Sequence, residues 1–249
     1  MKTDAKIMLD QPDKNAVGGG AAYGLFSYVL IPFVLYWVSF SFNDDRFRFW
    51  GQLAHYVINF FMAVSLFREY LRDAFFAVRT EAKMVFREIT WPVIGIIAYY
   101  FGLLQLLSPL DNAFLNDLLM GSLPLGEVDI LLFVSDFIYI SPILGSLAVI
   151  LLTPVTTTCL YYAVGFAPVC YKKPWLAYVV VALVLAIPRA INSFLFWSAE
   201  QEFAIYLGQL PIHLLACRAY QKSDTVWAPI FCLVIANLVA CAMMALFVL

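Results

Sequence analysis

The chain has 249 residues, of which 63% are hydrophobic and 13% are charged, whereas soluble domains average about 45–50% and about 25%. With a mean hydropathy of +0.86 and a net charge of −2, it has too little polar surface to cover a water-soluble globule. The composition therefore excludes soluble enzymes, nucleic-acid-binding modules and disulfide-stapled secreted scaffolds. It predicts a helical membrane protein, because the apolar runs are too long for the strands of an outer-membrane barrel.

Several apolar runs have roughly the 20-residue length that a helix needs to cross a bilayer. We expect an all-α, polytopic transmembrane bundle of about seven spans, preceded by a flexible cytoplasmic tail over residues 1–22 that includes a run of three glycines. The predicted spans are residues 23–41, 50–67, 90–107, 143–167, 175–197, 203–220 and 226–249.

Two segments between the amino-terminal spans of residues 23–142 have a different character. Residues 68–88 interleave basic and aromatic side chains, which predicts a cytoplasmic amphipathic helix that either attracts anionic headgroups or simply connects two spans in solvent. Residues 110–140 are expected to lie at the outer surface. Within them, residues 128–140 are apolar but short for a crossing and contain Asp136, so we expect a re-entrant or interfacial segment.

The basic residues indicate the orientation of the chain. With the amino terminus inside, the cytoplasmic segments contain 12 of the 15 Lys and Arg residues and the outer segments contain two, while Arg189 lies within the fifth span. Because Lys and Arg favour the cytoplasmic side, we expect a cytoplasmic amino terminus and an outer carboxyl terminus. The absence of a recognisable eukaryotic targeting signal favours the bacterial plasma membrane.

Three short motifs follow one another in the last hundred residues. They are residues 153–165 (TPVTTTCLYYAVG), residues 192–200 (NSFLFWSAE) and residues 218–237, which contain a polar turn and the stretch WAPI. This order resembles the CAAX-protease and bacteriocin-processing family of intramembrane glutamate proteases, with its E-E-x-x-x-R helix, its F-x-x-x-H helix end and its W-A-P-I-x-x-H-x-x-x-N helix. The resemblance covers residues 143–249 and implies a CAAX-protease-like four-helix core.

Aligned on Pro154, the motifs keep framework residues and lose most of their ionisable ones. The family's positions fall on Thr157 and Thr158 for the glutamates, Tyr162 for the arginine, Phe196 for the aromatic, Glu200 and Leu233 for the histidines and Asn237 for the asparagine. In such a protease, glutamate activates water, while histidine and asparagine hold the oxyanion. Because threonine is uncharged and leucine has no donor, the resemblance implies a degenerate member with no catalytic residue retained.

The polar residues on these predicted spans allow two interpretations. The three threonines 156–158, Tyr162, Asn192, Ser193 and Asn237 could line a vestigial pocket, or they could form hydrogen bonds between helices. Arg189 either pairs with Asp136 or Glu200, or extends toward the outer surface. The lone histidines have no ligand spacing, so the sequence supports no metal site and no cofactor.

Three classes of function remain open. The first is a non-catalytic scaffold or binding subunit for another membrane protein, a hydrophobic or lipidated peptide, or a lipid of the bilayer. The alternative is an active intramembrane peptidase, or an enzyme acting on lipids or isoprenoids, with a site rewired around Glu200. The third is a transporter or channel subunit, which the scarcity of ionisable residues at membrane depth makes the least favoured. Nucleic acid is not an expected partner.

Overall fold

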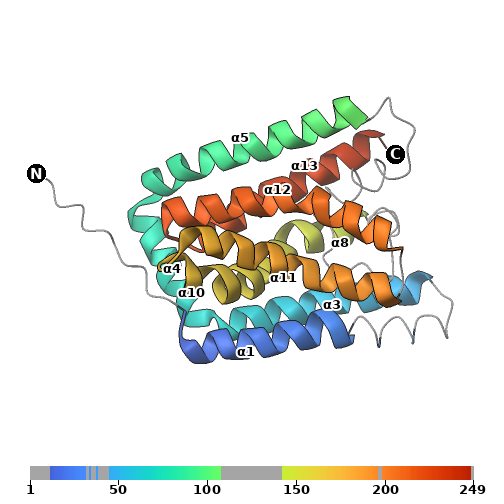
Figure 1. Cartoon of the computed structure of the whole chain (residues 1–249), viewed down its shortest axis with the longest axis horizontal. Coiled ribbons are helices and arrows are strands. Elements are labelled where there is room, and N and C mark those ends of the chain that lie inside the picture. The colour runs from blue at the N-terminus through green and yellow to red at the C-terminus, as the bar shows by residue number, and fades with distance from the viewer. Residues whose placement is uncertain are drawn as a thin grey trace, which may run out of the picture.

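The computed structural model describes residues 12–31, 34, 38, 45–107, 142–195 and 198–247. In these ranges the secondary structure is helical, with no strand, so the predicted all-α class is confirmed there. The predicted outer segment 110–140, with Asp136, and the motif residue Phe196 lie outside the described residues. The helices run side by side in an elongated bundle, and the short helix α4 lies across one end (Figure 1).

The elements are named in chain order, with η marking a π-helical stretch. They are α1 (Lys14–Leu25), η1 (Phe26–Leu30), α3 (Asp45–Leu66), α4 (Arg68–Thr80), α5 (Ala82–Leu107), α8 (Pro142–Leu147), η2 (Ala148–Leu152), α9 (Thr153–Thr157), η3 (Thr158–Phe166), α10 (Ala167–Cys170), α11 (Pro174–Leu195), α12 (Ala199–Ser223) and α13 (Trp227–Phe247).

One helical segment of the described chain, Ile143–Cys170, is 28 residues long and apolar enough to cross a membrane. Two shorter apolar stretches, Pro174–Ala190 and Trp227–Ala242, lie in α11 and α13. By length and composition, the structure therefore contains one clear candidate for a membrane span. The number of seven spans stays a prediction.

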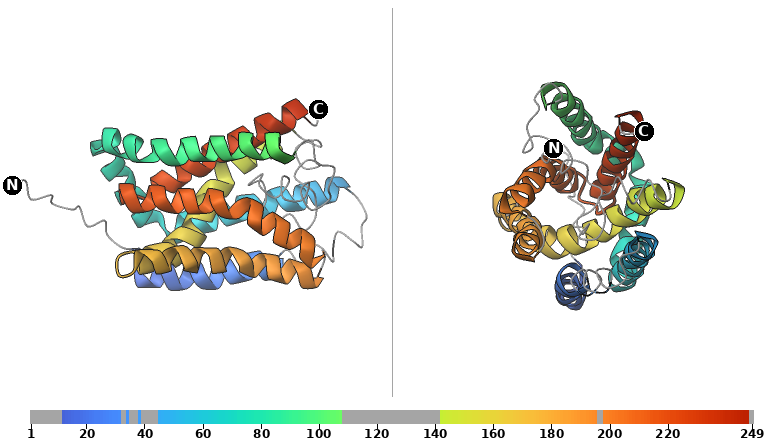
Figure 2. Two further views of the ribbon diagram at one scale, coloured as in Figure 1. Left: turned by 45° about the horizontal axis from the view of Figure 1, so that its top comes forward. Right: turned by 90° about the vertical axis from the view of Figure 1, so that its right-hand side faces the viewer.

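The segment from α8 to α10 forms the centre of the bundle. It crosses the other helices obliquely (Figure 2) and packs on α1, α3, α11 and α13. Each described π-helical stretch ends two residues before a proline, at Pro32, Pro154 and Pro168. A proline lacks the amide N–H and its ring crowds the carbonyl four residues earlier, so the wider π-turn relieves that crowding. Other prolines, such as Pro188, lie inside α-helices without such a turn.

The start of α1 differs from the predicted flexible tail. The helix begins at Lys14 and includes all three glycines. Gly20 is buried, and a Cβ atom built on it would lie 2.7 Å from Cζ of Phe67 and 2.9 Å from Cγ2 of Val164. The glycine therefore permits a close approach of α1 to Phe67, at the junction between α3 and α4, and to the central segment. The sequence alone did not predict this packing role.

The predicted amphipathic helix 68–88 is divided in two by the structure. Its first part is α4, which ends at Thr80, and its second part belongs to the long helix α5. Leu71, Ala74 and Val78 form the buried face of α4 at helical spacing, while Phe75 is exposed. The predicted amphipathic character is therefore present, but over a shorter helix.

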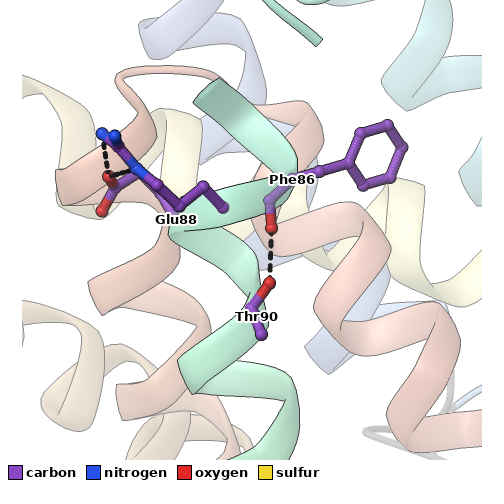
Figure 3. Close-up of polar contacts among 4 residues, drawn as sticks. Phe86, Glu88 and Thr90 are labelled. Atoms are coloured by element: carbon purple, nitrogen blue, oxygen red, sulfur yellow. Dashed lines mark hydrogen bonds and ion pairs between the residues drawn. The ribbon is translucent and has the colours of Figure 1, made fainter. Parts of the chain in front are cut away.

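The first turns of α5 satisfy their polar groups locally (Figure 3). The Thr90 hydroxyl donates to the Phe86 carbonyl at 2.7 Å, and Arg87 pairs with Glu88 at 2.8 Å. The Arg87 side chain is 76% exposed, so the ion pair contributes about 0–1 kcal/mol. Pro92 follows inside the same helix, and its missing N–H leaves the Glu88 carbonyl without its usual helical donor.

Candidate functional site

The first and third motifs of the predicted vestigial site lie on the central segment and on α13, which run in opposite directions (Figure 1). Asn237 donates from Nδ2 to the Val149 carbonyl at 2.7 Å and to Oγ1 of Thr153 at 3.0 Å. Leu233 lies one helical turn before Asn237, and Thr157 lies one turn after Thr153. The antiparallel register therefore brings Leu233 and Thr157 to the same level of the bundle.

These motif positions are buried and tightly packed. Thr157, Thr158, Leu233 and Asn237 are each at most 5% exposed. Oγ1 of Thr158 and Oδ1 of Asn237 have no hydrogen-bond partner among the described residues. The central segment and α13 pack on each other here, and the buried motif side chains on them supply hydroxyls and an amide but no carboxylate.

Tyr162, at the position of the family's arginine, contacts a residue that the sequence reading treated as isolated. Its hydroxyl lies 2.6 Å from Nδ1 of His213 on α12, and both side chains are buried. The two residues are 51 positions apart in the chain, so no local pattern could have paired them. The contact joins the central helix to α12.

Arg189 forms a second polar site with α12. Its Nη2 atom donates to Oε1 of Gln209 at 3.0 Å, and its Nη1 atom lies 3.6 Å from Oε2 of Glu202. Arg189 is 7% exposed and Glu202 is 3% exposed. The partner of Arg189 is therefore Glu202, and the predicted pairing with Glu200 is wrong because Glu200 is exposed on the first turn of α12.

Both carboxylates lie in the first turn of α12. Ser198 is the N-cap residue, and its Oγ accepts a hydrogen bond from the Gln201 amide at 3.2 Å. Glu200 and Glu202 are two positions apart on the helix and so point to different sides, and the packing of α12 buries Glu202 and leaves Glu200 exposed. Of the other predicted residues here, Phe196 and the side chain of Asn192 lie outside what the structure describes, and Ser193 donates to the Ala190 carbonyl.

A pocket of about 300 Å³ opens beside the Arg189–Glu202 pair, between α11 and α12. Small and aromatic side chains form most of its wall. Its lining residues are Ala186, Arg189, Ala190, Ser193, Ala199, Glu202, Phe203 and Tyr206. The pocket combines apolar walls with one buried positive and one buried negative charge, which is a typical composition for a ligand site.

A third polar cluster, also absent from the predicted site, joins α1 and η1 to α3. Asn59 accepts from the Tyr23 hydroxyl at 2.7 Å and from the Ser27 hydroxyl at 2.5 Å, and its amide nitrogen lies 2.8 Å from Nε2 of His55. Each of these contacts links neighbouring helices or successive turns. The cluster is best explained as helix packing, because buried polar groups in apolar surroundings need partners.

Metal or disulfide chemistry has no structural basis in the described part of the chain. Its His, Cys, Asp and Glu side chains form no group of three or more that could hold a metal ion. No disulfide joins the five cysteines.

We compared the chain with protein-family models, curated proteins and solved structures. None of them matches it.

Proposed function

We propose that this chain is a polytopic membrane protein, with a cytoplasmic amino terminus, that binds or scaffolds a membrane partner without proteolytic activity. The distribution of side chains over the described helices supports the bilayer location. Large apolar residues such as Phe61, Trp91 and Leu183 are 61–76% exposed, whereas His213, Glu202 and other polar residues are buried. Exposed apolar groups and buried polar groups are the arrangement expected for helices surrounded by lipid.

The absence of proteolytic activity is proposed from the motif positions. A glutamate protease needs a general base and an oxyanion donor, and each contributes about 10²-fold or more to the rate. Here the corresponding positions hold Thr157, Thr158 and Leu233, all buried, and the Asn237 amide is already bonded to Val149 and Thr153. This one observation carries the proposal, because none of these side chains can take a proton from water at neutral pH.

The experiment combines a cleavage assay with partner identification. The tagged chain is purified in mild detergent and incubated with prenylated and unmodified hydrophobic peptides, beside an active member of the CAAX-protease family. We expect no cleavage, and a membrane protein or lipidated peptide recovered in stoichiometric amount.

The Glu200→Gln variant is the control for a rewired site. Cleavage by the wild-type chain that disappears in this variant would overturn the proposal and establish a peptidase built on Glu200. Cleavage that persists in the variant would also overturn it, and would place the catalytic group elsewhere.

A further inference from the structure

The pocket beside Arg189 has the size of a small polar group rather than of a whole lipid or peptide. Its volume of about 300 Å³ is at the lower end of the range of about 300–1,000 Å³ for ligand pockets. It is lined by Ala186, Ala190 and Ala199, whose small side chains leave the space, and by Phe203 and Tyr206. It therefore suits the head of a larger molecule whose remainder lies outside.

The charges in the pocket restrict the chemistry of that head. Arg189 and Glu202 both line the wall, and their charged atoms lie 3.6 Å apart. A purely anionic head would be repelled by Glu202, and a purely cationic head by Arg189, at a depth where water screens little. A zwitterion with an acidic group next to a primary ammonium complements both charges at once.

The surface outside the pocket is apolar along one line of α11. Leu183 is 61% exposed and Ile187 is 49% exposed. Ile187 follows Leu183 by four residues and Ala190 follows Ile187 by three, so the three residues share one face of α11. Phe203 on α12, which also lines the pocket, is 55% exposed. A hydrocarbon chain attached to the head would thus pass from the pocket toward the middle of α11.

We infer that this pocket binds the phosphoethanolamine head of a lipid, with the phosphate toward Arg189, the primary ammonium toward Glu202 and the acyl chains along Leu183 and Ile187. The inference rests on the proposed membrane location and is independent of whether the chain cleaves peptides. A free small zwitterion shares this chemistry, and the test separates the two sources.

The test measures lipid retention by native mass spectrometry of the delipidated chain in detergent. Phosphatidylethanolamine, phosphatidylcholine and phosphatidylglycerol are added at equal concentrations. Because three methyl groups prevent the choline nitrogen from donating a hydrogen bond, we expect about a tenfold preference for ethanolamine over choline, the effect of one hydrogen bond to a charged group. Equal retention of the two lipids would overturn the inference.

Two variants locate the binding. Glu202→Gln removes the negative charge that pairs with the ammonium and leaves a weaker, neutral acceptor, and we expect the preference for ethanolamine over choline to be lost. Glu200→Gln is the matched control, because it removes an exposed carboxylate two positions away, and it should keep the preference. Loss of the preference in both variants, or in neither, would place the site elsewhere.

A second variant, which fills the pocket, and its matched control test the inference if Glu202→Gln fails to fold. Ala190 is exposed at the pocket mouth, so Ala190→Phe should leave the fold intact and reduce ethanolamine-lipid retention. Leu238→Phe adds a ring at an exposed position of α13 and should have no effect. Retention unchanged in Ala190→Phe, with both proteins monodisperse by size exclusion, would contradict the assignment.

Two further results are informative. Saturation by soluble O-phosphoethanolamine, without selective retention of the lipid, would overturn the lipid assignment in favour of a free zwitterion. A chain that stays monodisperse without detergent and retains none of the three lipids would instead refute the proposed membrane location, and the pocket assignment with it.

Discussion

The guanidinium of Arg189 is buried among helices, and this single charge has consequences for stability. Removing a charged group from water costs several kcal/mol, and a partner offsets that cost only if the pair stays intact. Arg189 has Glu202 as its ionic partner and Gln209 as a hydrogen-bond acceptor, both on α12. The pair therefore joins α11 to α12 through electrostatics as well as packing.

We expect Glu202→Leu to lower the free energy of unfolding by about 3–5 kcal/mol, because it leaves the Arg189 charge buried without its carboxylate. The double variant Arg189→Met with Glu202→Leu should recover most of this loss, since two apolar side chains have no charge to desolvate. Denaturant unfolding in micelles measures the free energy of unfolding of the single and the double variant. Glu200→Leu, at an exposed position, should change stability by less than about 0.5 kcal/mol. A double variant as unstable as the single one would show that the charge is not the cause.

At the scale of elements, the glycines of α1 are not equivalent. Gly20 faces Phe67 and Val164 at distances that leave no room for a methyl group, whereas Gly18 has nothing within 4 Å of its Cβ position. Phe67 is itself buried, so its ring cannot move aside freely. Two glycines two residues apart thus have opposite structural roles.

Replacing these glycines with alanine should change stability in opposite directions. Gly20→Ala overpacks the contact with Phe67 and should destabilise by about 1–3 kcal/mol. Gly18→Ala improves helix propensity at an open position and should stabilise by up to about 1 kcal/mol. Thermal unfolding of the two variants and of the wild type measures both changes in stability. Equal effects of the same sign would mean that α1 does not pack as described.

Helix α4 is held against the bundle by two aromatic contacts. The Trp227 indole N–H donates to the Leu71 carbonyl at 3.0 Å, and the hydroxyls of Tyr70 and Tyr220 lie 2.6 Å apart. Burial raises the pKa of the Tyr70 hydroxyl well above its usual value, so this group stays protonated over the physiological pH range. These contacts fix α4 across the end of the bundle.

We expect Trp227→Phe to loosen α4, because phenylalanine keeps the ring contact with Phe75 but loses the indole N–H. One hydrogen bond contributes about 0.5–1.5 kcal/mol, so tryptic cleavage at the exposed Arg79 should be roughly two- to tenfold faster. Trp91→Phe, at a position that is 76% exposed, serves as the control and should leave the cleavage rate unchanged. An unchanged rate in Trp227→Phe would show that the indole bond does not hold the helix.

At the scale of the whole molecule, the two ends of the bundle differ in charge and structure. The end with α4 also contains the turn between α10 and α11 with Lys172 and Lys173, and the opposite end contains the junction between α11 and α12 (Figure 1). Basic residues favour the cytoplasmic face of a membrane. The proposed orientation therefore places the α4 end inside and the Arg189 pocket toward the outer face.

Cysteine labelling tests this orientation. In a cysteine-free background, Ala199→Cys should react with a membrane-impermeant maleimide in intact cells, and Lys172→Cys should react only after lysis. Both positions are exposed in the structure, so a difference in labelling reports the membrane side rather than burial. Labelling of Lys172→Cys alone in intact cells would reverse the orientation. Equal labelling of both would refute a span between them.

The amino-acid sequence alone predicts the all-α class and the approximate positions of the helices, and it leaves open whether Arg189 has a partner or extends toward the outer surface. The helical class follows from the composition, and the helix positions follow from the lengths of the apolar runs. Both are properties of the local sequence. The boundaries that differed, at Lys14 and Thr80, lie where polar residues also suit a helix surface, so hydropathy could not set them.

Which side chains meet depends on how the helices pack in three dimensions. Arg189 pairs with Glu202 and not with Glu200 because α12 packs with Glu202 on its buried side. The contact between Tyr162 and His213 depends on how two distant helices pack. The pocket beside Arg189 likewise arises from small residues on α11 and α12 that adjoin only after folding. Such contacts are a property of helix packing in three dimensions, because they join residues that no local periodicity connects.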